Sequence, residues 1–403
     1  MPAPRTVYDA VLQAARDVTK LGCALDAEML GTALLGSVYA VAADDRAAAV
    51  RDFVGRFLTA TTDPDTPATA TIREVFATLV PDADGAAEVG HGTQAPSWAT
   101  QLGRVRPTGC WAYGDVYGDQ TSYLVTYAYE DGSDGGPEHA VVALVDHNIG
   151  ITKDVFVATS ATPLLAQVRE ICEADELTWF RSEDPGRLRD EVGRHLQVTD
   201  ELSDLPSDGS LATDRALASA RLALLPTVTT PPLVEPAGPT GHALIRDFLA
   251  SPEAVLFELP TGAGSEADVA SMDFCLSLVL DHAASLPGGD PLRWSPAVAG
   301  LFLLDWVHRR AVLDLDDAAM MPRVVRAWSA YSTGRRNLPP AAVRETEASL
   351  EELIPEFARL YTTGERRSPA TAAVAQLISE GVDPSDTAAI DAWLEANSDD
   401  GPG

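Results

Sequence analysis

The sequence predicts an α+β protein, in which N-terminal helices surround a small antiparallel sheet and an all-α helical domain follows. Three observations support this prediction. Apolar residues recur at helical spacing along most of the chain, and aromatic and β-branched residues alternate between about residues 108 and 158. A proline-rich segment, residues 226–240, separates two parts of different character. The 403 residues are enough for two or three domains.

Helices are expected over residues 6–60 and over Thr71–Val80. In the first stretch, apolar side chains such as Val50 and Phe57 recur at intervals that place them on one helix face. The segment Thr61–Thr69 is rich in threonine, proline and aspartate, so we expect it to be a loop.

The sheet is expected within residues 108–158. Tyr123, Val125 and Tyr127 alternate with smaller residues and would lie on one face of a strand. Because the strands follow one another closely, we expect an antiparallel sheet packed against the flanking helices. The four expected strands are Trp111–Asp119, Tyr123–Tyr129, Ala140–Val145 and Asp154–Ala158.

The rest of the chain is expected to be helical. Residues 163–225 would complete a first domain over residues 1–225, and residues 226–240 would form an extended linker. Residues 241–397 would form the all-helical second domain, with residues 398–403 as a disordered tail.

Two helix starts in the second domain are marked by capping residues. Ser295 precedes Pro296, which suits an N-cap followed by the first helical position. Ser265 and Asp268 form a second capping pattern. The glycine-containing segment that leads into this cap, Leu259–Glu266, lacks the lysine of a phosphate-binding loop, so nucleotide binding is not expected there.

The composition disfavours several kinds of partner. Acidic residues number 60 against 29 basic ones, a net charge of −31 that repels nucleic acid and anionic membranes. We see no signal peptide and no apolar run long enough for a bilayer, so a cytoplasmic location is expected. Four cysteines without CxxC spacing predict neither a disulfide framework nor a zinc signature.

Potentially reactive side chains are most concentrated in residues 138–154. Carboxylates and imidazoles are the usual ligands of zinc, iron and manganese. His139 and His147 are eight residues apart on one strand, roughly 26 Å, so they cannot share an ion. The expected constellation gathers at one end of the sheet. Its metal ligands would be Asp115, Asp119, Asp146 and His147, and its catalytic residues Asp146, His147 and Asp154.

The alternative interpretation of this cluster is a tight turn. Aspartate and asparagine side chains bond nearby backbone amides, and the Asn-Ile-Gly sequence of residues 148–150 suits a turn. Lys153 and Asp154 would then be an exposed pair.

Six arginines form a local cationic patch in the second domain, which could dock an acidic partner. The alternative is that they pair with the nearby acidic residues Asp314, Asp316 and Asp317. The six are Arg309, Arg310, Arg323, Arg326, Arg335 and Arg336.

Three functions remain open. The absence of standard catalytic motifs favours a non-catalytic interaction or regulatory protein, with another protein or a second copy as its partner. The first alternative is a metal-dependent hydrolase with its site at Asp146 and His147, which makes a divalent metal the one cofactor considered. The second is an acidic mimic of nucleic acid.

Three parts of the chain are informative when taken together. The first has the pattern His-Ala-x-x-x-x-Val-Asp-His-Asn. The parts are His139–Val157, Pro291–Arg310 with Met321–Arg336, and Gly381–Asn397. Together they resemble a group of hypothetical proteins from actinobacteria. A composition rich in alanine, arginine and aspartate, with only two lysines, is typical of such genomes. The resemblance implies no particular activity and no site residue.

Overall fold

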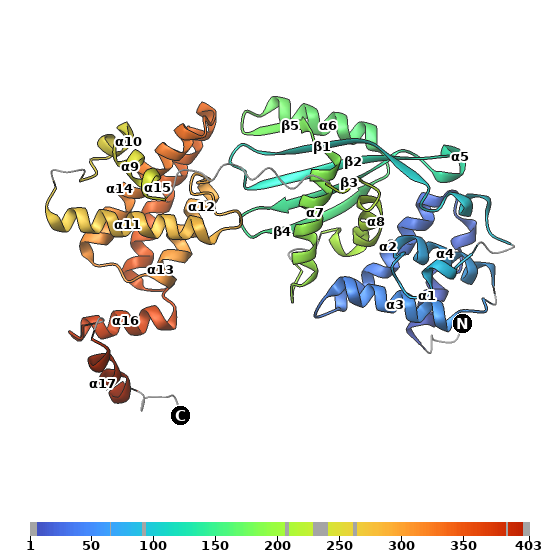
Figure 1. Ribbon diagram of the computed structural model, residues 1–403, viewed down its shortest axis with the longest axis horizontal. Coiled ribbons are helices and arrows are strands. Elements are labelled where there is room, and N and C mark those ends of the chain that lie inside the picture. Colours follow the sequence, from blue (N-terminus) through green and yellow to red (C-terminus); the bar gives the residue numbers. More distant parts are fainter. Residues whose placement is uncertain are drawn as a thin grey trace. The chain divides into compact units, whose positions relative to one another are not determined.

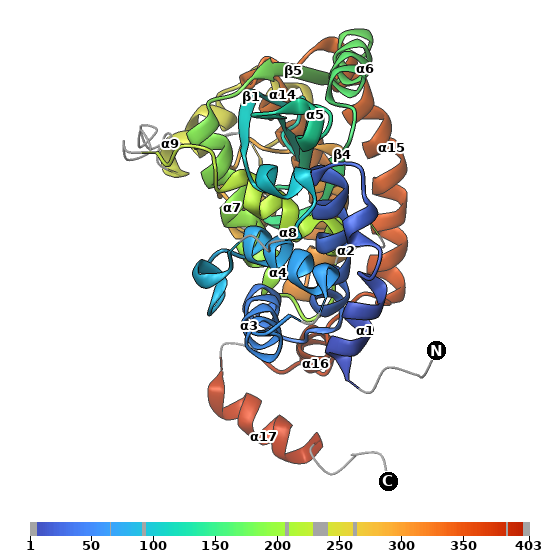
Figure 2. The same cartoon turned by 90° about the vertical axis from the view of Figure 1, so that its right-hand side faces the viewer.

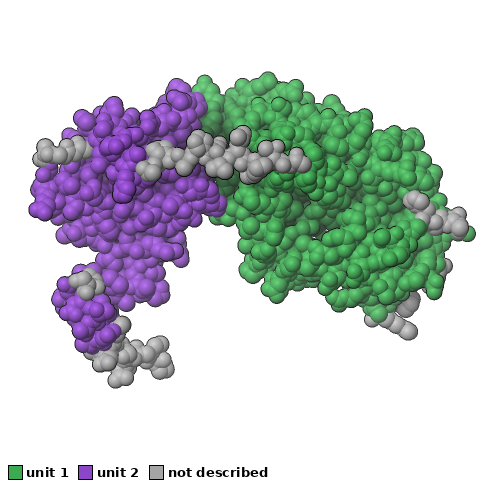
Figure 3. Space-filling model, viewed as in Figure 1, with its two compact units in different colours: residues 1–233 green, residues 234–403 purple. Residues whose placement is uncertain are grey.

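The chain divides into two compact units, residues 1–233 and 234–403 (Figure 3). The division falls inside residues 226–240, the predicted linker, most of which lies outside the described residues, as does the predicted tail 398–403. The computed structural model describes residues 6–64, 66–90, 94–205, 209–228, 241–260, 264–383 and 386–397.

Unit 1 is built on a five-stranded antiparallel sheet with the strand order β4-β3-β2-β1-β5 (Figure 1). The first four strands pair in succession, and β5 then pairs with the free side of β1. The predicted α+β class is therefore confirmed. The strands are β1 (Val105–Asp115), β2 (Gln120–Tyr129), β3 (His139–Asp146), β4 (Ile151–Ala158) and β5 (Thr178–Ser182).

β5 corrects the prediction that residues 163–225 are helical throughout. It has only five residues, too few for a clear periodicity, and its identity as a strand depends on the open edge that β1 offers. The first predicted strand is also shifted, because β1 ends at Asp115 and residues 116–118 turn the chain toward β2. Gly118 has φ 78°, a left-handed conformation that suits glycine in such a turn.

Helices cover both faces of this sheet. α7 (Pro185–Asp200) and α8 (Leu211–Leu222) pack on one face, where Val125, Tyr127 and Val155 belong to the main core. α6 (Ala161–Ala174) lies on the opposite face, over a smaller core around Leu124 and Val142. α2 (Ala24–Val41) and α4 (Pro67–Leu79) pack together with α8 (Figure 2).

The remaining helices of unit 1 complete the N-terminal layer. Thr66 caps α4 by accepting from the amide of Thr69, so this helix starts at Pro67 and the predicted loop over residues 61–69 is too long. The other helices are α1 (Val7–Ala14), α3 (Arg46–Ala60), α5 (Gly132–Gly135) and the 3₁₀ turns η1 (Val18–Lys20), η2 (Ala86–Glu88) and η3 (Ser97–Gln101).

One described helix, α2, has the length and apolar character of a membrane span, with a mean hydropathy of 1.2. Half of it is buried inside unit 1, and its buried residues include the polar Glu28 and Thr32. Thr32 accepts from the amide of Leu217 in α8 and donates to the carbonyl of Thr213. We therefore assign α2 to the core of unit 1.

A buried ion pair connects the layers of unit 1. The guanidinium of Arg221 in α8 bonds the carboxylate of Glu28 in α2, and both side chains are at most 1% exposed. Arg221 also donates to His139 Nε2 of β3 at 3.0 Å and to the Tyr129 hydroxyl of β2 at 2.9 Å. Burial, reinforced by the Arg221 charge, lowers the pKa of His139 to about 3. His139 is thus a neutral hydrogen-bond acceptor in this network.

Unit 2 is all-helical, as predicted. Ser295 caps α12 with Pro296 at the first helical position, and Ser265 with Asp268 forms a capping box at α11. Its elements are α9 (Gly241–Leu249), α10 (Pro252–Leu256), α11 (Glu266–Ser285), α12 (Pro296–Leu301), the π-helical turn η4 (Phe302–Trp306), α13 (Val307–Arg310), α14 (Leu315–Arg335), α15 (Pro340–Thr363), α16 (Pro369–Ser379) and α17 (Thr387–Asn397).

An aromatic cluster surrounds His282 in the core of unit 2. The ring centroids of Phe302 and Trp306 lie 5.4 and 5.3 Å from the imidazole, and Trp294 meets it edge-on. Neither ring nitrogen of His282 has a hydrogen-bond partner among the described residues. Burial lowers the pKa of His282 to about 4, because a charged imidazole is costly in apolar surroundings.

The buried ion pair generates a first prediction. Glu28→Gln leaves Arg221 charged and uncompensated in the core, so we expect the free energy of unfolding of unit 1 to fall by about 3–5 kcal/mol. Urea unfolding of the full chain measures this loss. Arg56→Ala, which breaks the exposed pair of Arg56 with Asp52, is the control and should cost at most about 1 kcal/mol. Equal losses in the two variants would contradict the prediction.

A second prediction concerns pH. His282 has a folded-state pKa of about 4 against an ordinary value of 6.5, so the unfolded state binds more protons between these values. The stability of unit 2 is therefore complete above about pH 6.5 and falls by up to about 3 kcal/mol toward pH 4. The free energy of unfolding of unit 2 is measured at each pH by hydrogen exchange in urea, followed on peptides from α11. His282→Phe should remove this part of the pH dependence, and an unchanged slope would count against the assignment.

Candidate functional site

The β3–β4 turn carries the histidine that the sequence analysis singled out. Asp146 accepts from the amide of Asn148 at 3.0 Å, and the amide of Gly150 donates to the Asp146 carbonyl at 2.8 Å. Gly150 has φ 73°, which a residue with a side chain rarely adopts. The backbone amide of His147 donates to the Asp119 carbonyl at 2.8 Å. Asp146 therefore makes the local backbone bonds that the turn interpretation predicts.

Helix α7 lies next to this turn because it is tied to β4. The Thr199 hydroxyl donates to the Thr152 carbonyl at 3.0 Å and accepts from the Thr152 amide at 2.9 Å. Both bonds are buried, so they hold the C-terminal part of α7 against the start of β4. His195, one helical turn before Thr199, is thereby brought to the β3–β4 turn.

The result is a group of three potential metal ligands from two elements. One ligand atom each of His147, Glu191 and His195 lies within 4.8 Å of the other two. The rings of His147 and His195 meet edge-on at a centroid distance of 5.6 Å. In the described part of the chain, no other group of three histidine, cysteine or acidic side chains meets this condition.

The hydrogen bonds of His195 select its tautomer. Its Nδ1 lies 2.8 Å from the backbone carbonyl of Glu191, which can only accept, and 3.7 Å from Glu191 Oε1. In the neutral ring the proton therefore sits on Nδ1, and Nε2 carries the lone pair. In metal sites, the histidine nitrogen that does not bind the metal commonly donates a hydrogen bond of this kind, which orients the ring. The His195 side chain is only 3% exposed, so its position is well constrained.

Glu191 and His147 form the open side of the group. The Glu191 side chain is 30% exposed, and its Oε2 pairs with Arg194 at 2.5 Å. His147 is half-buried, with Nε2 3.0 Å from the hydroxyl of Thr121 on β2. Solvent can therefore reach two of the three ligands, while the third is anchored in the interior.

Tyr123 lies on β2 two residues beyond Thr121, and so on the same face of the sheet. Burial raises the pKa of its phenol well above the usual range, and the charges of Glu191 and Glu183 add to this effect. The hydroxyl is therefore a protonated hydrogen-bond donor at neutral pH.

The residue types of this group suit a divalent transition metal. Two imidazoles and one carboxylate form the ligand set of one class of catalytic zinc sites, whose fourth position is taken by water. Tetrahedral ligands at zinc lie about 3.3 Å apart, so the three side chains would have to close by roughly 1–1.5 Å. Glu191 can make such a movement because it is partly exposed and its arginine partner is at the surface.

Two of the predicted carboxylate partners of His147, Asp115 and Asp146, bond other groups. Asp115 accepts from the amides of Asp119 and Gln120 at 3.0 and 2.7 Å, which shapes the β1–β2 turn. Asp146 accepts from the Gln120 side chain and lies 4.0 Å from Lys153. Asp115, Asp119 and Asp146 lie outside the three-ligand group, in which Glu191 and His195 accompany His147.

Asp154, the third predicted catalytic residue, is placed on β4 opposite Leu144. Its carboxylate accepts from the amide of Val155 at 2.9 Å and lies against Gly209. Lys153 faces Asp146, so the expected exposed pair of Lys153 with Asp154 is replaced by a different one.

The predicted arginine patch of unit 2 is largely engaged in local contacts. Arg309 pairs with Asp305 at 2.8 Å, one helical turn earlier. Arg326 pairs with Glu351 of α15 at 2.8 Å. The patch as predicted comprised Arg309, Arg310, Arg323, Arg326, Arg335 and Arg336.

The expected acidic partners of that patch form a helix cap. Asp314 and Asp317 make the capping box at the start of α14. Arg335 instead lies 3.9 Å from Asp247, and Arg323 donates to a main-chain carbonyl at 3.4 Å. The predicted pairing with residues 314–317 is thus replaced by contacts with other elements.

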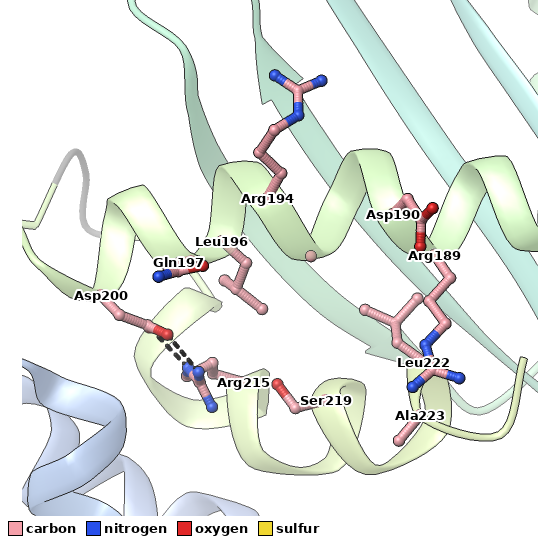
Figure 4. Close-up of a pocket in the computed structure, with 11 residues that line it drawn as sticks. Arg189, Asp190, Arg194, Leu196, Gln197, Asp200, Arg215, Ser219, Leu222 and Ala223 are labelled. Atoms are coloured by element: carbon pink, nitrogen blue, oxygen red, sulfur yellow. Dashed lines mark hydrogen bonds and ion pairs between the residues drawn. The ribbon is translucent and has the colours of Figure 1, made fainter. Parts of the chain in front are cut away.

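A pocket of about 460 Å³ lies between α7 and α8 (Figure 4). Leu196 and Leu222 point into it, and the ion pair of Asp200 with Arg215 closes one end. Arg194 extends away from α8 in this view. The pocket lining contains none of the three potential ligands, so we do not place the chemistry there.

Sequence analysis missed Glu191 and His195, although a signal was present. The two residues are four apart in Glu-Val-Gly-Arg-His, which puts both on one face of a helix. What the sequence could not show is that this face meets His147, which is 44 residues before Glu191 in the chain. No family model, curated protein or solved structure matches this chain, so the site is argued from its own geometry.

The position of Asp115 generates a third prediction. Asp115→Ala removes both carboxylate bonds to the β1–β2 turn, so we expect a loss of about 1–2 kcal/mol in the free energy of unfolding. Zinc affinity should be unchanged, because Asp115 is outside the three-ligand group. Urea unfolding and a zinc titration on the same preparation measure the two quantities. A lost zinc affinity with unchanged stability would restore Asp115 as a ligand.

Proposed function

We propose that this protein is a metal-dependent hydrolase, with a divalent ion bound by His147, Glu191 and His195. The observation that carries the proposal is the convergence of these three side chains within 4.8 Å. It keeps the hydrolase hypothesis of the sequence analysis and its His147, and replaces the other ligands.

The number and type of ligands support a reactive ion over a structural one. Structural zinc sites are closed by four protein ligands, usually including cysteine, whereas catalytic sites have three and keep one position for water. Of the four cysteines, none belongs to this group. A divalent ion held by His147, Glu191 and His195 would supply an activated water at neutral pH, which is the chemistry that hydrolysis needs.

The surrounding residues of the chain would position the reaction. The Nδ1 bond of His195 to the Glu191 carbonyl restrains its ring and leaves the lone pair on Nε2 available to an ion. The Thr121 hydroxyl on β2, 3.0 Å from Nε2 of His147, restrains the second ring. The protonated phenol of Tyr123 is a candidate donor to a developing oxyanion on the substrate.

The interaction hypothesis is a weaker proposal. Its main support was the absence of recognised motifs, and the arginine patch that would have docked a partner is largely paired within unit 2. We therefore place metal-dependent hydrolysis first, and an interaction or regulatory role second.

The fourth prediction tests the proposed site. Protein purified without a histidine tag should bind one zinc per chain, measured by titration calorimetry and by elemental analysis after dialysis. His147→Ala, Glu191→Gln and His195→Ala should each weaken binding by about 100-fold or more, because each removes one of three ligands. Circular dichroism checks that each variant is folded.

His242→Ala is the control for the loss of a histidine that lies outside the site. His242 is exposed and lies in unit 2, so its loss should leave the affinity unchanged. Wild-type protein that takes up no zinc, cobalt or manganese would refute the proposed function. Hydrolysis of activated ester and phosphate substrates, abolished in all three site variants, would establish the reaction class.

A further inference from the structure

We propose that Arg187 and Arg194 make this site a receptor for oxyanions, so that its substrates are phosphate or carboxylate compounds. The inference rests on the proposed metal site and names its substrate class. It is carried by the placement of two exposed arginines on either side of Glu191 along α7.

The spacing on α7 puts these arginines beside the open side of the site. Arg187 precedes Glu191 by four residues and Arg194 follows it by three, and both intervals place side chains on one helix face. His195 follows Glu191 by four residues and lies on the buried edge of this face. A molecule that approaches the exposed edge of Glu191 therefore meets a guanidinium on each side.

In the absence of a metal, Arg194 pairs with Glu191, the carboxylate that would bind the ion. Its Nη2 donates to Glu191 Oε2 at 2.5 Å, while its side chain is 63% exposed. Such an exposed pair is weak, so a divalent ion can displace it. The exchange frees a guanidinium next to the ion, and it leaves the ion with Glu191 carrying a net charge of about +1.

An anion is the ligand that such an arrangement favours. Arginine presents a rigid fork of donors that matches the paired oxygens of phosphate or carboxylate. Arg181 and Arg187 also lie close enough to Tyr123 to lower the pKa of its phenol, against the larger opposing effect of Glu191 and Glu183. A divalent ion bound by Glu191 would compensate the charge of that carboxylate, which favours an anionic substrate in a chain with a net charge of −31.

The test separates the two roles of Arg194 by the opposite signs of its effects. In Arg194→Ala the competitor for Glu191 is gone, so zinc affinity should rise about twofold to fivefold. Affinity of the zinc-loaded protein for inorganic phosphate should fall about tenfold. Both are measured by titration calorimetry on the full chain. A purely structural arginine would not produce a gain and a loss together.

Further variants define the contribution of charge and shape. Arg187→Ala should weaken phosphate binding and leave zinc affinity unchanged. Arg194→Lys keeps the charge without the fork, so it should recover part of the phosphate affinity. Arg56→Ala in α3 is the matched control, since Arg56 also pairs with an acidic residue on its own helix. It should alter neither affinity.

The outcomes distinguish failure of this inference from failure of the proposed function. Acetate serves as a second anionic probe beside phosphate. If the protein binds zinc but neither anion, the oxyanion receptor is overturned and the metal site remains. The same conclusion follows if phosphate binding is unaffected in Arg194→Ala and Arg187→Ala. Absence of zinc binding would overturn both. Tighter binding of phosphate than of acetate would assign phosphate compounds as the substrates, and the reverse order would assign carboxylates.

Discussion

The buried pair of Arg221 with Glu28 is the interaction on which the architecture of unit 1 depends. It joins α8 to α2, and through His139 and Tyr129 it reaches two strands of the sheet. An ion pair at this depth stabilises only if every partner is present, because a single charge left in the core would cost several kcal/mol. Because all four side chains must meet, α2 and α8 pack on the sheet in one position. α7 packs on the same face as α8.

The candidate site is a consequence of that packing. α7 has one apolar side in the core, which includes Leu188 and Val192, and its threonine bonds to β4 fix its position along the sheet. His195 is buried beside the β3–β4 turn for this reason, whereas Glu191 stays at the surface. A rigid ligand and a movable ligand on one helix form an arrangement that can accept an ion without refolding.

In the proposed site, the same helix would relate metal binding to substrate charge. A carboxylate that pairs with arginine in the absence of an ion, and binds the ion in its presence, would couple the two events through simple competition. The proposed coupling needs no change of fold, only the rotation of two exposed side chains. It would also give a very acidic protein a local means of attracting an anion.

The sequence by itself determined the fold class and the helical second unit, and it offered a turn at Asp146 as one of two interpretations, because periodicity, capping residues and turn residues act within a few positions of one another. It also pointed to His147. Only the tertiary structure decided that Glu191 and His195 lie beside His147, since α7 packs against β3 and β4. The edge strand β5 was likewise decided by the open side of β1. Contacts between distant segments depend on layer packing, for which the local pattern of residues carries no signal.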